Sequence, residues 1–288
     1  MLRFLLAVVS VMAASPVLAQ DGPTLKRIVA NKTFTIAYRD SSVPFSYIDP
    51  SGKPIGYSID ICVRIADAIK TEFKLDKLDI RFVSVTPQTR IPLISNGTAD
   101  IECGSSAITL GRLKQVDFLS PTFITGSRIM VRKGSDIHSM DDMNGKVLTA
   151  LFGTTNEQAA MSEIEKKHLT VQVVRVKEHS QAMLNLQQGR ADAYVADDID
   201  LYGIRSTSPN PESYEVTGPL FSYDPYAMIV PKNDGDFRAI GDATIARMVT
   251  SGEMAKLYAK WFTPGPTNIN VPMSELQKAA LQLDALPE

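Results

Sequence analysis

The chain has 288 residues, of which 44% are hydrophobic and 22% are charged, and its formal net charge at pH 7 is −2. This length allows two domains, each large enough to bury a core of its own. The nearly balanced charge gives no basis for nucleic acid as a partner, because nucleic-acid-binding proteins gather basic residues into patches.

The first 19 residues, MLRFLLAVVSVMAASPVLA, have the pattern of a signal peptide. Arg3 supplies the positive charge, residues 4–14 form the apolar core, and Val17-Leu18-Ala19 is a cleavage site of the small-residue type. The apolar run is too short to span a bilayer. We therefore expect an exported mature chain that begins near Gln20.

A strand is predicted over residues 34–38, and it ends in Arg39, which is followed by the small hydroxyl residues Ser41 and Ser42. Pro44 indicates that the chain has left the sheet by that point. Arg39 is either a solvated charge at the rim or an anion-binding group. Open α/β folds bind their ligands at the carboxyl edge of the sheet, where Arg39 would then lie.

The chain has two cysteines, Cys62 in an amphipathic helix predicted over residues 59–69 and Cys103 at the end of a strand over residues 100–103. In an exported protein they could form a disulfide, or both could be thiols buried in the core. The residues alone leave both alternatives open. With no CxxC or HExxH pattern and only three histidines, the sequence predicts no metal site, and we expect no cofactor.

Residues 78–104 and 170–198 follow one pattern: an alternating strand, a polar turn, a short helix, the residues Gly-x-Ala-Asp and a second strand. Gly97 and Gly189 occupy the same position in the two copies. Each suits the end of a helix, because glycine tolerates a positive φ there. The repetition predicts two α/β lobes of similar topology.

Polar residues stand out where these strands end and helices begin. After the strand over 78–85, TPQTR opens a helix with Thr86 as its cap and places Arg90 in the first turn, where the helix dipole disfavours a cation. Arg90 is therefore either solvated or directed at an anion. His179 occupies the matching junction of the second copy, either as an ordinary cap or rim residue or as a ligand group.

Other junctions carry groups suited to a zwitterion. Residues 104–112, GSSAITLGR, offer backbone amides beside Arg112 that could hold a carboxylate, although a plain turn has the same composition. Gly153-Thr154-Thr155 offers similar groups at a helix start. Asp197 and Asp198, at the end of a predicted strand, either hold an ammonium group or are solvated. The whole set suits a small zwitterion with extra negative charge.

The chain resembles the periplasmic glutamate/aspartate-binding proteins of ABC importers, in the polar amino-acid solute-binding family. The likeness is carried by YRDSSVPFSYID, QTRIPLISNGTADIECGSS, FGTT, EHS and the acids at Asp197, and it extends from TLKRIVANK to the C-terminal helix. It implies an α/β, two-lobed periplasmic binding protein fold of type II, with two crossing hinge strands. Lobe 1 would comprise residues 20–121 and 227–288, lobe 2 residues 127–221, and the hinges residues 122–126 and 222–226.

The resemblance also implies a function and a ligand set. The protein would be a monomeric periplasmic carrier, not an enzyme, that delivers L-glutamate or L-aspartate to an inner-membrane ABC permease. Carried over by position, Arg112 would bind the α-carboxylate with Ser105 and Thr155, and Asp197 would bind the α-ammonium. The side-chain carboxylate would be held by Arg39, Arg90 and His179. The full set is Arg39, Arg90, Ser105, Ala107, Arg112, Thr155, His179 and Asp197.

The chain departs from the family pattern at two positions. Pro87 stands where the relatives carry Ser, which removes a hydroxyl from the side-chain pocket, and Ala107 stands where they carry Thr. The alternatives to an acidic amino-acid carrier are a carrier for another polar amino acid and an enzyme on the same bilobal fold. Glycoside hydrolysis would need two carboxylates across the cleft, whereas the candidates here are mostly cationic.

Overall fold

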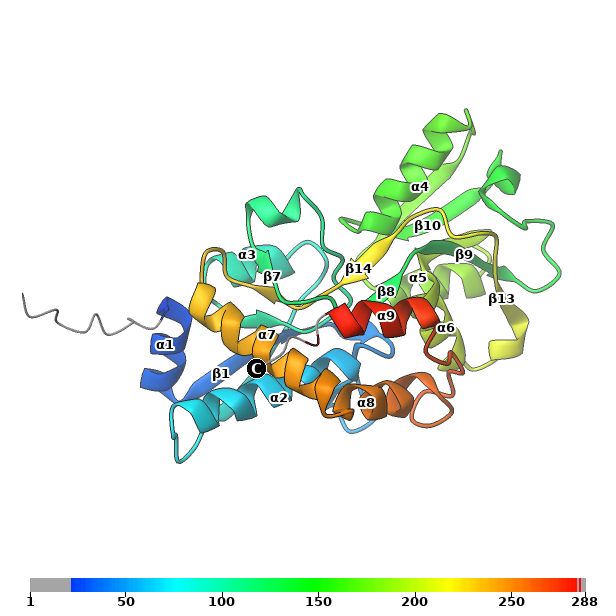
Figure 1. Ribbon diagram of the computed structural model, residues 1–288. Helices are drawn as coiled ribbons and strands as arrows, with labels where there is room; N and C mark the ends of the chain where they lie inside the picture. The colour runs from blue at the N-terminus through cyan, green and yellow to red at the C-terminus, as the bar shows by residue number, and fades with distance from the viewer. Residues whose placement is uncertain (1–21, 284, 286–288) are drawn as a thin grey trace, which may run out of the picture.

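A computed structural model describes residues 22–283 and 285, which form two lobes joined by a pair of strands (Figure 1). The sheet of the first lobe has the order β5-β1-β6-β15-β7. β1 is parallel to β5 and β6, and the late strand β15 is antiparallel to β6 and β7. The bounds are β1 Thr33–Tyr38, β5 Asp79–Ser84, β6 Ile101–Glu102, β7 Asp117–Phe118 and β15 Ile229–Val230.

The second lobe has a five-stranded sheet in the order β11-β10-β12-β9-β13. β10 is parallel to β11 and β12, whereas β9 is antiparallel to β12 and β13. The bounds are β9 Ser127–Arg132, β10 Val147–Leu151, β11 Gln172–Val176, β12 Ala193–Asp197 and β13 Tyr214–Thr217. A mixed α/β lobe on each side of a two-strand connection confirms the predicted fold class.

The two copies of the sequence pattern have equivalent structural roles in the two lobes. Gly97 and Gly189 follow the short helices α3 (Arg90–Ser95) and α5 (His179–Gln187) with φ of 75° and 69°. Asp100 accepts a hydrogen bond from the backbone amide of Thr35 at 2.7 Å, and Asp192 accepts one from that of Val147 at 2.8 Å. Each aspartate thus satisfies an amide of the neighbouring parallel strand just before pairing begins.

Helices cover both faces of each sheet. In lobe 1, α2, α7 and α8 cover one face and α3 lies against the other (Figure 1). In lobe 2, α4 packs on the side of Ile129 and Val131, while α5 and α6 pack on the side of Met130, as expected from the alternation along β9. The helix bounds are α1 Pro23–Asn31, α2 Tyr57–Glu72, α4 Thr155–Lys166, α6 Asp198–Ser206, α7 Gly235–Thr250, α8 Glu253–Phe262 and α9 Glu275–Leu283.

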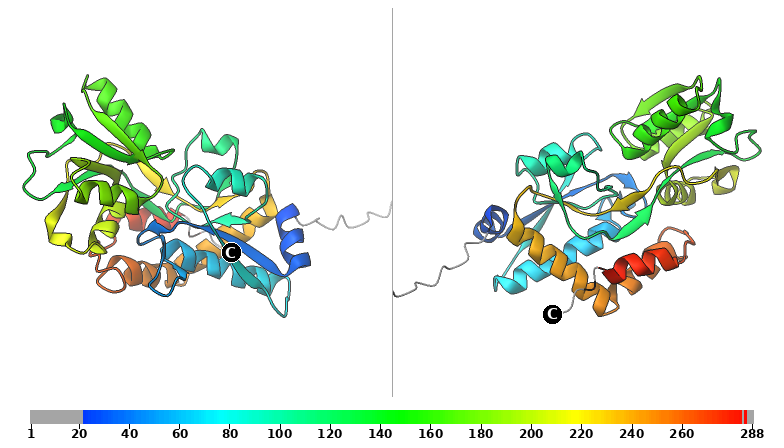
Figure 2. Two further views of the ribbon diagram at one scale, coloured as in Figure 1. Left: turned by 180° about the vertical axis from the view of Figure 1, so that it is seen from behind. Right: turned by 45° about the horizontal axis from the view of Figure 1, so that its top comes forward.

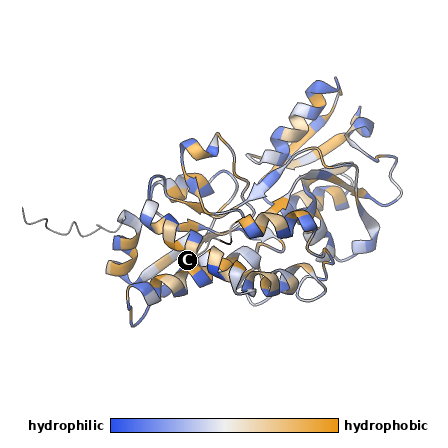
Figure 3. Ribbon diagram, in the orientation of Figure 1, coloured by the Kyte–Doolittle hydropathy of each residue, from blue (hydrophilic) through white to orange (hydrophobic). Residues whose placement is uncertain are grey.

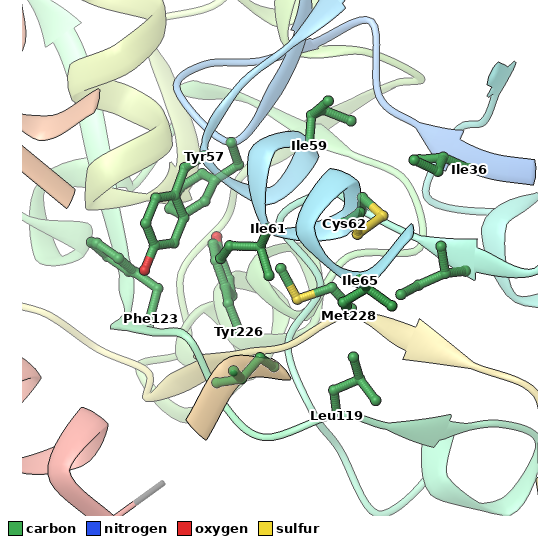
Figure 4. Close-up of a cluster of buried hydrophobic side chains, with 14 of the residues drawn as sticks. Ile36, Tyr57, Ile59, Ile61, Cys62, Ile65, Leu119, Phe123, Tyr226 and Met228 are labelled. Carbon is green, nitrogen blue, oxygen red and sulfur yellow. A yellow bond between two sulfur atoms is a disulfide. The ribbon is translucent and has the colours of Figure 1, made fainter. Parts of the chain in front are cut away.

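The helices are amphipathic, and Figure 3 shows apolar and polar residues alternating around them. In lobe 1 the aromatic rings of Phe45, Tyr57, Phe123 and Phe262 meet at centroid distances of 4.8–6.1 Å. Figure 4 shows Tyr57 and Phe123 beside Tyr226 next to α2. None of the helices in residues 22–283 combines the length and hydropathy that a bilayer span requires.

The remaining elements are short. A three-stranded sheet follows β1, and within residues 22–283 three 3-10 turns lie in the connections. Their bounds are β2 Ser41–Ser42, β3 Ser46–Ile48, β4 Pro54–Ile55, η1 Arg112–Lys114, η2 Met140–Met143 and η3 Pro211–Ser213.

The connection between the lobes is an antiparallel pair, β8 (Phe123–Thr125) and β14 (Asp224–Tyr226), visible between the lobes in Figure 2. The C-terminal helix α9 lies against β8. Its Gln277 side chain accepts a hydrogen bond from the Ile124 amide at 2.8 Å and donates one to the Thr122 carbonyl at 3.2 Å. Residues far apart in the sequence therefore meet on the connecting strands.

The predicted start of α3 was wrong by three residues. The helix begins at Arg90 with Thr89 in the cap position, instead of being capped by Thr86. The Thr86 carbonyl accepts hydrogen bonds from the amides of Thr89 and Arg90 at 3.2 and 3.1 Å, so the intervening residues form a turn. Pro87 favours that turn because its fixed φ suits the second turn position. Arg90 still falls at the helix start.

Cys62 of α2 and Cys103, which follows β6, form a disulfide. Both are fully buried, and the bond links a covering helix to the sheet beneath it. A cross-link over a loop of this kind stabilises a domain by about 2–4 kcal/mol. The predicted signal peptide, residues 1–19, lies outside the described residues.

Candidate ligand-binding site

Three arginines are buried at the carboxyl edge of the first sheet. Arg39 follows β1, Arg90 begins α3 after β5, and Arg112 begins η1 after β6, with exposed fractions of 1%, 2% and 9%. Buried guanidinium groups are costly unless they are paired. Their position matches the edge where open α/β sheets bind ligands.

Arg39 forms an ion pair across the two lobes. Its Nη2 donates to Oε2 of Glu178 at 2.9 Å, and the Ser41 hydroxyl donates to the same oxygen at 3.0 Å. Glu178 directly precedes α5 in lobe 2. The buried Nε of Arg39 has no hydrogen-bond partner within the described residues. Nη2 of Arg39 is thus paired with a carboxylate, whereas its Nε–H is still able to donate a hydrogen bond.

Arg90 belongs to a buried chain of polar groups. Its Nη1 donates to the Ser106 hydroxyl at 2.5 Å, and that hydroxyl donates to Oε2 of Glu102 at 2.7 Å. Arg90 Nε and Glu102 Oε1 are buried without a partner in residues 22–283. Burial, followed by the positive charge of Arg112, lowers the pKa of Arg90 to about 9. An anion placed here would offset the repulsion between the arginines.

Arg112 connects lobe 1 to the start of α4. Its Nη1 donates to the Ala107 carbonyl at 2.6 Å, and its Nη2 lies 3.5 Å from the Gly153 carbonyl in lobe 2. Thr155, the first residue of α4, is half-buried two residues further on. Ser105 is buried, and its hydroxyl donates to the Ser42 hydroxyl at 3.2 Å. The groups predicted to bind an α-carboxylate therefore come from neighbouring segments.

His179, the first residue of α5, is buried and neutral. Its Nδ1 contacts the Tyr194 hydroxyl, and its Nε2 lies 4.0 Å from Oδ2 of Asp200. Burial, followed by the charges of Arg39 and Arg90, lowers the pKa of His179 well below its ordinary value. At neutral pH the imidazole therefore offers a hydrogen bond and no charge.

Asp197 ends β12 and is 2% exposed. Its Oδ2 accepts a hydrogen bond from the Tyr226 hydroxyl, and its Oδ1 is buried without a partner in the described part of the chain. Burial, followed by the charges of Asp224 and Asp200, raises the pKa of Asp197 well above its ordinary value. A nearby cation would stabilise the ionised form.

Asp198 does not share the hydrogen-bond partner of Asp197. Oδ1 of Asp198 accepts a hydrogen bond from the Thr125 hydroxyl at 2.7 Å. Asp200 shares the partner of Asp197 instead, because its Oδ2 accepts a hydrogen bond from the Tyr226 hydroxyl at 3.0 Å. Residues three apart share a face of a helix whereas adjacent residues do not, which explains the exchange.

The lobes also touch outside the arginine cluster. The Gln88 side-chain amide donates to the Phe152 carbonyl. Gly203 of α6 packs so closely on lobe 1 that a Cβ atom there would lie 1.9 Å from the carbonyl oxygen of Val43. The structure is therefore one in which the lobes are in contact.

Reasoning from the sequence missed several polar groups of this site, most of them buried. Asp200 had a usable signal, the spacing of three from Asp197 at a helix start. Glu102 had another, a carboxylate inside an apolar strand. Tyr226 had none, since it lies on the connecting strand β14 and its partners lie in lobe 2. The missed set is Glu102, Ser106, Glu178, Tyr194, Asp200 and Tyr226.

The site has a cationic side and an acidic side. Three arginines and a neutral histidine can take two carboxylates through charge-assisted hydrogen bonds. Asp197 and its neighbours can take a cationic group. A small molecule with two carboxylates and one ammonium group matches both sides.

Comparisons with known proteins agree with this chemistry. The family model described as bacterial extracellular solute-binding proteins, family 3, matches residues 34–264. The L-glutamate/L-aspartate-binding protein of Pseudomonas aeruginosa is 39% identical over 275 residues, which cover 93% of this chain and 91% of that protein. The glutamate/aspartate import solute-binding protein of Salmonella typhimurium is 37% identical over 262 residues, which cover 90% and 87%.

A solved structure is similar as well. The ancestral amino acid-binding protein AncCDT-1, a precursor of cyclohexadienyl dehydratase, is 27% identical with a TM-score of 0.73. The match covers 83% of this chain and 100% of that one. On the extent of the family match and the identity to these relatives, this chain belongs to family 3 of the bacterial extracellular solute-binding proteins.

Proposed function

We propose that this protein is a periplasmic, non-enzymatic carrier that captures L-glutamate or L-aspartate between its lobes and delivers it to an inner-membrane ABC permease. The observation that carries the proposal is the burial of three arginines opposite Asp197. The names of the two relatives above, both binding proteins for glutamate and aspartate, support it.

Each group of an acidic amino acid has a proposed partner. Arg112 binds the α-carboxylate with Ser105, Thr155 and the backbone at Ala107. The α-ammonium binds Asp197, whose Oδ1 is buried without a partner in residues 22–283.

The side-chain carboxylate binds Arg39, Arg90 and His179. The buried Nε atoms of both arginines lack hydrogen-bond partners within the described residues, and a ligand carboxylate would supply them. The neutral amide of glutamine offers only one acceptor oxygen and no charge, so the same groups discriminate against it.

Titration calorimetry with the mature chain tests the ligand. Glutamate or aspartate should bind at least about 100-fold more tightly than glutamine, because each charge-assisted hydrogen bond contributes ~1.5–3 kcal/mol. Nuclear magnetic resonance spectra of the same samples should show unchanged ligand after prolonged incubation. Equal affinity for glutamine would point to a carrier for another polar amino acid, and a new product would point to an enzyme.

We further propose that the lobes close on the ligand by bending at residues 122–126 and 222–226. These segments contain β8 and β14, and they separate the proposed lobe 1 (20–121 and 227–288) from lobe 2 (127–221). Cross-lobe contacts such as Arg39 to Glu178 would then form on closure.

Small-angle X-ray scattering checks this movement. Saturating glutamate should reduce the radius of gyration, while the forward scattering should correspond to one chain of 31.5 kDa less its signal peptide. Superimposable curves with and without glutamate would contradict closure at these hinges. A forward scattering twice as large would contradict the proposed monomer.

A further inference from the structure

The hydroxyl of Tyr226 lies between two buried carboxyl groups. It is within hydrogen-bond distance of Oδ2 of Asp197 and 3.0 Å from Oδ2 of Asp200. The three residues are only 2–3% exposed. A phenol has one proton to donate, so it cannot satisfy two carboxylate anions at once. A proton on one of the two carboxyl groups resolves the conflict, because that group can donate.

Each carboxyl group also has an oxygen atom left over. Oδ1 of Asp197 and Oδ1 of Asp200 are both buried without a hydrogen-bond partner in the described range. Buried carboxyl oxygens are normally hydrogen-bonded. Asp197 is already the proposed partner of the α-ammonium, and Asp200 shares the Tyr226 hydroxyl with it. A cationic group that reaches Asp197 therefore comes close to the second carboxyl group as well.

The surroundings of Asp200 contain few compensating charges. Arg39 is the cation that acts on it, from the end of β1, and His179 on α5 is neutral. Burial raises the pKa of Asp200 to about 7, although the hydrogen bond from Tyr226 and the charge of Arg39 lower it. The titratable and polar groups that face the Asp197–Asp200 pair are Arg39, Ser105, Arg112, Asn156, His179, Tyr194, Asp198, Asp224 and Tyr226.

We propose that Asp200 is a second ammonium-recognising carboxyl group of the cleft, and that the Asp197–Asp200 pair holds one proton, which amino-acid binding releases. This inference rests on the proposed function. Two interacting carboxyl groups titrate as a pair, and an ammonium group within about 4–6 Å lowers a carboxyl pKa by roughly 1–3 units. The pair then carries two negative charges beside one positive charge, and the proton passes to the buffer.

The sign of the pH dependence follows from this balance. Because the complex holds fewer protons than the free protein, affinity rises with pH, by up to about tenfold per pH unit near pH 7. The increase ends where the free pair is already ionised. Arg90, with a pKa of about 9, keeps its proton in this range, and His179 and Tyr226 stay neutral. The released proton therefore comes from the carboxyl pair.

Calorimetry in two buffers measures the released proton. Glutamate is titrated at pH 7 in phosphate and in Tris, whose ionisation enthalpies differ widely, and the dependence of the observed heat on that enthalpy gives the number of protons. We expect about half a proton to one proton released by the unmodified mature chain. The Asp200→Asn variant keeps a neutral hydrogen-bonding group of the same shape, so it should fold and bind while releasing none.

Asp236→Asn is the control, because it makes the same chemical change at an exposed aspartate in the first turn of α7. It should release as many protons as the unmodified chain. Heats that do not depend on the buffer, or an Asp200→Asn variant that still releases a proton, would overturn the inference. Absence of glutamate binding in either buffer would instead overturn the proposed function on which it rests.

Discussion

Replacing Arg90 with methionine should weaken glutamate binding by roughly two to four orders of magnitude. The ligand carboxylate would lose a charge-assisted hydrogen bond, which contributes ~1.5–3 kcal/mol, and a buried charge left without its partner costs about 3–5 kcal/mol. Ser106 and Glu102, which form a buried chain with Arg90, would remain in place. Titration calorimetry with glutamate and glutamine measures the two losses.

The comparison between ligands makes this result specific. The affinity for glutamine should fall much less than the affinity for glutamate, since the neutral side-chain amide of glutamine forms no ion pair with Arg90. His179→Ala should show the same bias with a smaller loss, because the neutral imidazole contributes a hydrogen bond only. Arg81→Met removes an exposed arginine from β5 in the same lobe and should leave both affinities unchanged. Equal losses for glutamate and glutamine in Arg90→Met would place Arg90 outside the side-chain pocket.

The Gly203→Ala variant should bind every amino-acid ligand about 5–150-fold more weakly. A Cβ atom at Gly203 would lie 1.9 Å from the Val43 carbonyl oxygen of the opposite lobe, and this neighbour is backbone that cannot rotate away. Overpacking of this kind typically costs 1–3 kcal/mol. Within α6 itself, alanine is favoured over glycine by about 1 kcal/mol, so the thermal stability of the ligand-free protein should not fall.

A second glycine provides the control for this variant. Gly235 begins α7, and a Cβ atom there would meet nothing within 4 Å. Gly235→Ala should therefore leave the affinities for glutamate and glutamine unchanged. If Gly203→Ala binds glutamate as tightly as the unmodified chain, the lobes do not approach at α6 and Val43 in the complex.

The sequence anticipated elements better than it anticipated contacts between them. The matched positions of Gly97 and Gly189 predicted the topology of both lobes, because a helix end and a buried strand are determined by residues close together in the chain. For Arg39, residue-level reasoning favoured a rim charge and left a ligand group as the alternative. Its burial depends on Glu178 in the other lobe, which local sequence patterns do not reveal.

The acidic side of the site illustrates the same limit. Adjacent acids at 197 and 198 looked like a pair, yet the chain passes from strand to helix between them and Asp198 turns toward Thr125. Asp200 could have been predicted from helical spacing. Tyr226, which joins the two acids, comes from a strand that returns after the whole second lobe, and no spacing rule connects it to them.

The contact of Gln277 with β8 bears on whether molecules of this protein pair with one another through their strands. A two-stranded ribbon has unpaired backbone groups along its outer edges, and such edges invite pairing with a strand from another molecule. The Gln277 amide binds the Ile124 N–H and the Thr122 carbonyl, the same two groups that an added strand would use. The Gln277 side chain thus helps to shield the edge of the connecting segment from intermolecular β-pairing, without adding a third strand that would stiffen it.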